Sequence, residues 1–250
     1  MRRIITFAVL CLLSALTQAQ QVAPPDEPAP LTLHQLVAAE SEARDRRDLL
    51  SYLLNLELRT LDDEGRVTGS KEGAWRVMRL GIDRRVERVR ESRSTLKNIR
   101  LSGQALARWV ESLPVLFFDP ECPARLVRTE RRGDGWALLY RTTYAGQRKC
   151  FDGLVWVDEA GRVLEADGRR EPARRFIDGE ESVSPRIRMK MNAEGLPAEI
   201  EGEDVLTYFS VRDKNGAPLR VRVRLSARYS EYKRPRASEP VVTYGDIVLE

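Results

Sequence analysis

The chain is dominated by segments in which apolar and polar side chains alternate, the pattern of a β-strand with one buried face. The first covers residues 50–58, and a turn at residues 62–65 leads to a returning strand over 67–80. The alternation is clearest in residues 219–229, where every second residue is apolar and the positions between them include four arginines. Further strands are predicted over residues 83–96, 126–131, 136–144, 149–157, 162–167, 186–191 and 241–249.

Two segments have helical periodicity instead. Thr32 and Gln35 have the spacing of a capping box, which predicts a helix from residue 33 to about residue 48. A second amphipathic helix is predicted over residues 101–113, ending before Pro114. Its apolar stripe consists of Leu106, Trp109, Val110 and Leu113.

The one-sided alternation indicates the fold class. Parallel strands buried on both faces have continuous apolar runs, whereas these strands are apolar on one side and are joined by tight turns. We therefore expect a mainly β (α+β) protein built on a single large, coiled antiparallel sheet of about ten strands. This incomplete β-barrel would carry the two amphipathic helices on its concave face. No internal repeat or linker divides residues 31–250, so we expect one domain there.

The first nineteen residues have the form of a cleaved signal peptide. Arg2 and Arg3 precede a short apolar run over residues 4–16, and small residues stand before the predicted cleavage after Ala19. The run is too short for a stable membrane anchor. Residues 20–30 contain four prolines and are expected to form an extended linker. We expect a periplasmic protein without a transmembrane anchor after cleavage.

Charge and cysteine content narrow the function classes. Removing Arg2 and Arg3 from the 42 basic residues leaves 40, against 38 acidic residues, a net charge of +2. Such a balance disfavours a nucleic-acid partner. Cys122 and Cys150 remain after cleavage, and in an oxidising compartment we expect them to form a disulfide, with two buried free thiols as the alternative.

No pattern for catalysis is evident, and we expect a protein that is not an enzyme and has neither metal nor cofactor. His34 is the single histidine and lies in the first turn of the predicted helix, where it is expected to face solvent. The sequence holds no zinc-protease, serine-hydrolase or phosphate-loop motif. A hydrolase that uses paired carboxylates is the least favoured alternative, because the acids at residues 62–64, 158–159 and 180–181 fit turns.

The apolar face of the sheet is the main candidate site. It would either line a ligand cavity or form an ordinary packed core. The residues expected there are Leu54, Leu56, Leu58, Trp75, Leu106, Trp109, Trp136, Leu138, Val155, Val221 and Val223. The opposite face of residues 219–229 carries Arg220, Arg222, Arg224 and Arg228. It could bind phosphate or lipid headgroups, although a solvated face with cross-strand acid partners is the favoured alternative.

Residues 154–165, which read LVWVDEAGRVLE, resemble a "WxD…G" hairpin of the LolA/LolB-like superfamily of periplasmic lipoprotein carriers. Residues 227–233, ARYSEYK, are similar to the C-terminal part of secreted, lipoprotein-sorting-type members of that group. The resemblance implies an incomplete antiparallel barrel that holds helices and has an apolar cavity for acyl chains. It also implies a lipid or a lipidated protein as partner.

Together these features lead us to expect an exported binding protein that holds an acyl chain or a lipidated partner in an apolar half-barrel cavity, as a carrier or a sensor. The alternative is a structural or regulatory interaction module of the cell envelope, with a fully packed core and a protein partner.

The disulfide can be tested by counting thiols in the denatured mature protein without reductant. We expect no free thiol before reduction and two afterwards, because the crosslink closes a loop that would stabilise the fold by roughly 3–4 kcal/mol. Two reactive thiols in the unreduced protein would contradict the pairing of Cys122 with Cys150.

Overall fold

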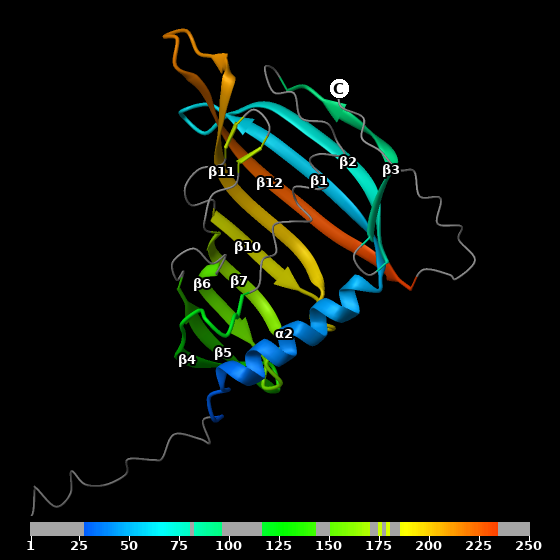
Figure 1. Ribbon diagram of the computed structural model, residues 1–250, viewed down its shortest axis with the longest axis vertical. Helices are drawn as coiled ribbons and strands as arrows, with labels where there is room; N and C mark the ends of the chain where they lie inside the picture. The colour runs from blue at the N-terminus through cyan, green and yellow to red at the C-terminus, as the bar shows by residue number, and fades with distance from the viewer. Residues whose placement is uncertain are drawn as a thin grey trace, which may run out of the picture.

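The computed structural model describes residues 28–80, 83–96, 117–143, 151–170, 175–176, 179–180 and 186–234. These residues form one α-helix and one large β-sheet (Figure 1). The helix is α2 (Leu33–Asp48). The strands are β1 (Ser51–Leu61), β2 (Val67–Leu80), β3 (Asp83–Ser94), β4 (Ala124–Arg132), β5 (Gly135–Thr142), β6 (Phe151–Val157), β7 (Val163–Arg170), β8 (Arg175–Phe176), β9 (Gly179–Glu180), β10 (Arg186–Met191), β11 (Pro197–Arg212) and β12 (Pro218–Lys233).

All strand pairs of the sheet are antiparallel. Ten strands follow one another in the order β3-β2-β1-β12-β11-β10-β7-β6-β5-β4, and the short strand β9 joins β11 and β8. The order ends at β3 on one side and at β4 on the other, so the sheet is open rather than a closed barrel. The prediction of a mainly β protein with one large antiparallel sheet is therefore confirmed.

One strand was missed, and two predicted elements lie outside the described residues. The alternation pattern predicted no strand between residues 191 and 219, yet β11 is one of the longest strands and pairs with both β10 and β12. Only α2 of the two predicted helices lies among the described residues. The second helix, at residues 101–113, and the strand at residues 241–249 both lie outside them, so packing of two helices on the sheet is not supported.

The capping box that predicts α2 is formed as expected. The Thr32 hydroxyl oxygen accepts a hydrogen bond from the Gln35 amide at 3.3 Å, and the Gln35 side-chain oxygen accepts one from the Thr32 amide at 2.8 Å. These bonds satisfy backbone groups that a helix start leaves without partners. His34, in the first turn, is exposed as predicted.

Helix α2 lies across one end of the sheet and defines its inner face (Figure 1). Leu36 is fully buried among side chains of the sheet, and the Tyr140 hydroxyl donates a hydrogen bond to the Leu31 carbonyl at 3.0 Å. The helix passes the β6–β7 turn, where a Cβ added to Gly161 would lie 3.3 Å from that of Ala39. Immediately after α2, the chain enters β1.

Four hairpin turns share one local chemistry. Each begins with Asp or Asn and has, three residues later, a glycine with positive φ, which an L side chain adopts only with strain. In the β6–β7 turn, the Asp158 carboxylate accepts hydrogen bonds from the amides of Ala160 and Arg162. The turns comprise residues 62–65, 158–161, 192–195 and 213–216.

Glycines on the inner face make room for aromatic rings. Gly153 and Gly168 are paired across β6 and β7, and the Phe151 ring lies against both. The Trp75 ring covers Gly73 in the same way on β2. Because these positions lack Cβ atoms, large rings lie close to the backbone and fill the space above it.

Both open edges of the sheet carry a bulge. Val89 in β3 and Val127 in β4 have no partner in the strand register, and their side chains are exposed. Most of the neighbouring edge residues are charged, among them Arg88, Arg90 and Arg128. Bulges and charges of this kind hinder pairing of an edge strand with another chain.

Cys122 is buried and disulfide-bonded. Its predicted partner, Cys150, lies outside the described residues, so that pairing stays a prediction.

Two glycines of neighbouring strands give a matched pair of variants, because Gly168 on β7 and Gly202 on β11 both pair with Ile187 on β10. A Cβ at Gly168 would lie 2.4 Å from the Asp152 carbonyl oxygen, whereas one at Gly202 would meet nothing nearer than 3.5 Å. We expect Gly168→Ala to lower the free energy of unfolding by about 1–3 kcal/mol and Gly202→Ala to leave it nearly unchanged. Urea denaturation checks this, and equal stability of the two variants would contradict it.

Candidate functional site

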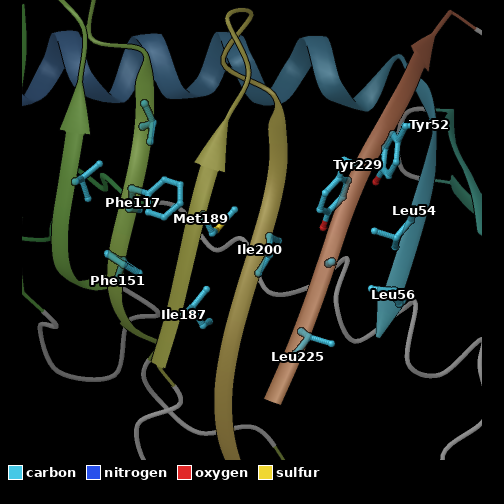
Figure 2. Close-up of a cluster of buried hydrophobic side chains, with 14 of the residues drawn as sticks. Tyr52, Leu54, Leu56, Phe117, Phe151, Ile187, Met189, Ile200, Leu225 and Tyr229 are labelled. Carbon is cyan, nitrogen blue, oxygen red and sulfur yellow. The ribbon is translucent and has the colours of Figure 1, made fainter. Parts of the chain in front are cut away.

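The inner face of the sheet carries one continuous cluster of buried apolar side chains (Figure 2). It extends from β2 through β1, β12, β11, β10, β7 and β6 to β5, and α2 contributes Leu36. Side chains on successive strands point to the same side because the register keeps their alternation in phase. The cluster contains residues far apart in sequence, such as Leu54 and Val155.

Most residues predicted for the apolar side lie in this cluster. Those that are buried on the inner face are Leu54, Leu56, Leu58, Trp75, Leu138, Val155 and Val223. Val221 is partly buried against the cluster, and Trp136 is partly buried at the start of β5. Leu106 and Trp109 lie outside the described residues. The centre of the face, which was not predicted, is formed by Ile187, Met189 and Ile200 on β10 and β11.

Phe117 and Phe118 are a further part of the inner face that the sequence analysis did not identify. Phe117 packs edge-on against Phe151 with ring centroids 5.1 Å apart, and Phe118 packs edge-on against Tyr140 at 5.9 Å. Both phenylalanines are buried, although neither belongs to a strand. The two side chains therefore fill space over β5 and β6 from outside the regular sheet.

The carboxylate of Glu40 holds these two residues to α2. One of its oxygens accepts a hydrogen bond from the Phe117 amide and the other from the Phe118 amide, each at 2.7 Å. Glu40 is four residues after Leu36 and so lies on the same side of α2. We call Glu40 with Phe117 and Phe118 the clamp.

The ionised form of Glu40 is opposed by its surroundings. Burial raises its pKa from 4.5 to about 7, although the two amide hydrogen bonds and the nearby Arg44 and Arg47 favour the charged form. The clamp therefore places a carboxyl group whose charged form is disfavoured by burial at the contact between α2 and the inner face.

The outer face of the sheet carries ion pairs between side chains of neighbouring strands. Asp167 accepts hydrogen bonds from Arg186 and Arg188, which lower its pKa although partial burial acts in the opposite direction. Arg224 pairs with Glu203 at 2.9 Å and Arg228 with Glu199 at 3.6 Å. The favoured interpretation of this face, cross-strand acid partners, is thus correct for Arg224 and Arg228. Arg220 and Arg222 form no ion pair with the described side chains.

A polar groove of about 490 Å³ lies on this outer face. The small side chain of Ser226 forms part of its floor, between Glu57 on β1 and Glu201 on β11. Its walls are the arginines and glutamates of β1, β10, β11 and β12. The groove therefore offers charged contacts, whereas the inner face offers apolar ones.

Other chemistry is sparse in the described part of the chain. No cluster of three histidine, cysteine or acidic side chains suited to a metal ion occurs there. No described helix is long and apolar enough to cross a membrane. Asp62, one of the acids considered for hydrolysis, accepts a hydrogen bond from Arg66 within its own turn, and this hydrogen bond lowers the pKa of Asp62.

A comparison with protein-family models found no match, and neither did a comparison with curated proteins.

The clamp predicts a specific pH dependence of stability. Because the folded-state pKa of Glu40 lies above its ordinary value, the folded protein holds this proton more tightly than the unfolded chain. This contribution to stability is fully present below about pH 4.5 and is lost as the pH rises through about 7. We expect the free energy of unfolding of the parent, relative to that of Glu40→Gln, to fall by up to about 3 kcal/mol over that range.

Urea denaturation of both proteins across this range measures the difference and cancels the titration of other groups. A difference that is constant, or that grows with pH, would contradict a raised pKa at Glu40.

Proposed function

We propose that the protein is an exported, non-enzymatic binding protein that takes up an acyl chain, or the lipidated end of a partner, against the inner face of its sheet. In this proposal, it acts in the periplasm after removal of the signal peptide, as a carrier or a sensor. The supporting observation is the continuous apolar inner face, which extends across eight strands with a single described helix at one end.

The clamp suggests where a ligand enters. Phe117 and Phe118 occupy the inner face over Phe151 and Tyr140, and the contact of their backbone with α2 passes through the single carboxylate of Glu40. Release of the two amides would free both rings together. An acyl chain would then take their place against the same apolar side chains.

The exchange is energetically reasonable. Burying a phenylalanine side chain stabilises a protein by about 1.5–3 kcal/mol, and each buried methylene contributes about 0.8 kcal/mol. Displacement of both rings is therefore offset by roughly four to eight buried methylenes. Longer chains would bind with a net gain, so the proposal implies a ligand with the chain length of a membrane lipid rather than a short acid.

A second candidate function is that of an envelope interaction module with a packed core. Two observations favour it: the inner side chains are already buried, and the charged groove lies on the outer face. In this case Phe117 and Phe118 would be permanent parts of the core and would not be exchanged for a ligand. The two candidates thus make opposite predictions for removal of these rings.

Calorimetric titration with fatty acids of increasing chain length tests the proposal. We expect the parent to bind long chains and Phe117→Ala/Phe118→Ala to bind them more tightly, with a shorter minimum chain length, because no ring must be displaced. The control is Phe209→Ala, which removes an exposed phenylalanine of β11 and should bind like the parent. If parent and double variant both stay folded by circular dichroism and bind no chain, the second candidate is favoured.

A further inference from the structure

The hairpin formed by the end of β11 and the start of β12 projects from the sheet at the end opposite α2 (Figure 1). We call residues 209–220 the tip hairpin. Its turn is fixed by Asp213, whose carboxylate accepts hydrogen bonds from the amides of Asn215 and Ala217. Gly216 supplies the positive φ that the turn requires. The tip is thus a well-defined structural element.

The tip hairpin carries three basic side chains. Arg212, Lys214 and Arg220 are exposed, and none of them forms an ion pair with a described side chain. Several arginines of the outer face nearer the centre of the sheet do have acid partners, among them Arg188 and Arg224. The one acid of the tip, Asp213, is engaged by backbone amides of its own turn.

An aromatic side chain accompanies these cations. Phe209 is 47% exposed, one of the few large apolar residues of the described chain with so much open surface. It lies where the pairing of β11 with β12 shifts register, between Tyr208 and Arg212. The tip hairpin therefore presents an exposed ring and three positive charges that no acid among the described side chains neutralises.

We propose that the tip hairpin docks the protein on an anionic lipid membrane. Basic side chains near such a surface are attracted to its headgroups, and an aromatic ring is favourable at the boundary between headgroups and acyl chains. Arg212, Lys214 and Arg220 can make these contacts without giving up an ion pair to any side chain that the structure describes. A projecting tip also meets a flat bilayer before the rest of the molecule does, whereas the charged groove of the outer face lies on the body of the sheet.

This role is separate from acyl-chain binding. The tip lies on strands β11 and β12 at the far end from the clamp, and membrane docking does not require Phe117 or Phe118 to move. The proposal about the tip can therefore fail while the proposed function holds, and the reverse is equally possible.

Sedimentation of the purified protein with vesicles tests the proposal. The vesicles consist of phosphatidylcholine, with or without phosphatidylglycerol, at low and at high salt. We expect binding only to the anionic vesicles, weakened by salt. Replacing Arg212, Lys214 and Arg220 by serine should reduce the affinity for anionic vesicles roughly a hundredfold, because each of the three charges contributes a factor of about five.

The matched control replaces three exposed arginines of β4, at positions 125, 128 and 131, by serine and so changes the net charge equally. This variant should retain most of the binding. Equal losses in the two triple variants would mean that only net charge matters, and this would overturn the assignment to the tip. A parent that binds no anionic vesicle, as expected if the tip serves an acidic protein instead, would also overturn it.

Insertion of the Phe209 ring into the membrane is tested in a separate experiment. Phe209 and Val127 are equally exposed, so Phe209→Trp and Val127→Trp place a tryptophan in similar solvent at two distant sites. With vesicles that contain brominated lipid, we expect extra quenching, relative to the parent, only for Phe209→Trp. Equal quenching of the two added tryptophans would contradict docking through the tip.

Discussion

The register of the antiparallel strands is the constraint on which the rest of the structure depends. Successive side chains of a strand point to opposite faces, so a slip of one residue would move apolar side chains outward and arginines inward. The rows that cross β1, β12, β11 and β10 keep both patterns in phase across these four central strands. One face can therefore carry a continuous apolar cluster, while the other carries cross-strand ion pairs, each weak by itself.

At the clamp, favourable burial of aromatic rings is opposed by unfavourable burial of a carboxylate. Burial of Phe117 and Phe118 is favourable, but it takes the Glu40 carboxylate out of water, and its pKa rises to about 7. The two amide hydrogen bonds compensate for only part of the lost hydration. In the proposed function, this contact positions the two aromatic rings and opens when a competing apolar surface is present. The proposed exchange of the rings for an acyl chain rests on this balance.

Local patterns in the sequence predict much of the fold. The capping box of Thr32 and Gln35 and the alternation in β1 and β12 can be recognised in the sequence, because the residues that form each pattern are close together along the chain. Strand β11 escaped prediction because Gly202 and the buried Asp204 interrupt its apolar side. The turns at residues 192–195 and 213–216 flank it and could have revealed it. The clamp could not be predicted, since Glu40 and Phe117 are 77 residues apart in sequence.

Native mass spectrometry of the protein, expressed with its signal peptide and purified without detergent, tests whether an acyl chain lies against the inner face. We expect a species heavier than the bare chain, whose extra mass is recovered by organic extraction as a lipid or an acylated peptide in near-stoichiometric amount. After the bound lipid has been removed, added long-chain fatty acids should restore the heavier species, whereas short ones should leave the bare mass, because short chains bury too few methylenes to displace Phe117 and Phe118. A bare chain alone, which also stays bare after incubation with long-chain lipid, would contradict acyl-chain binding and indicate a permanently packed core.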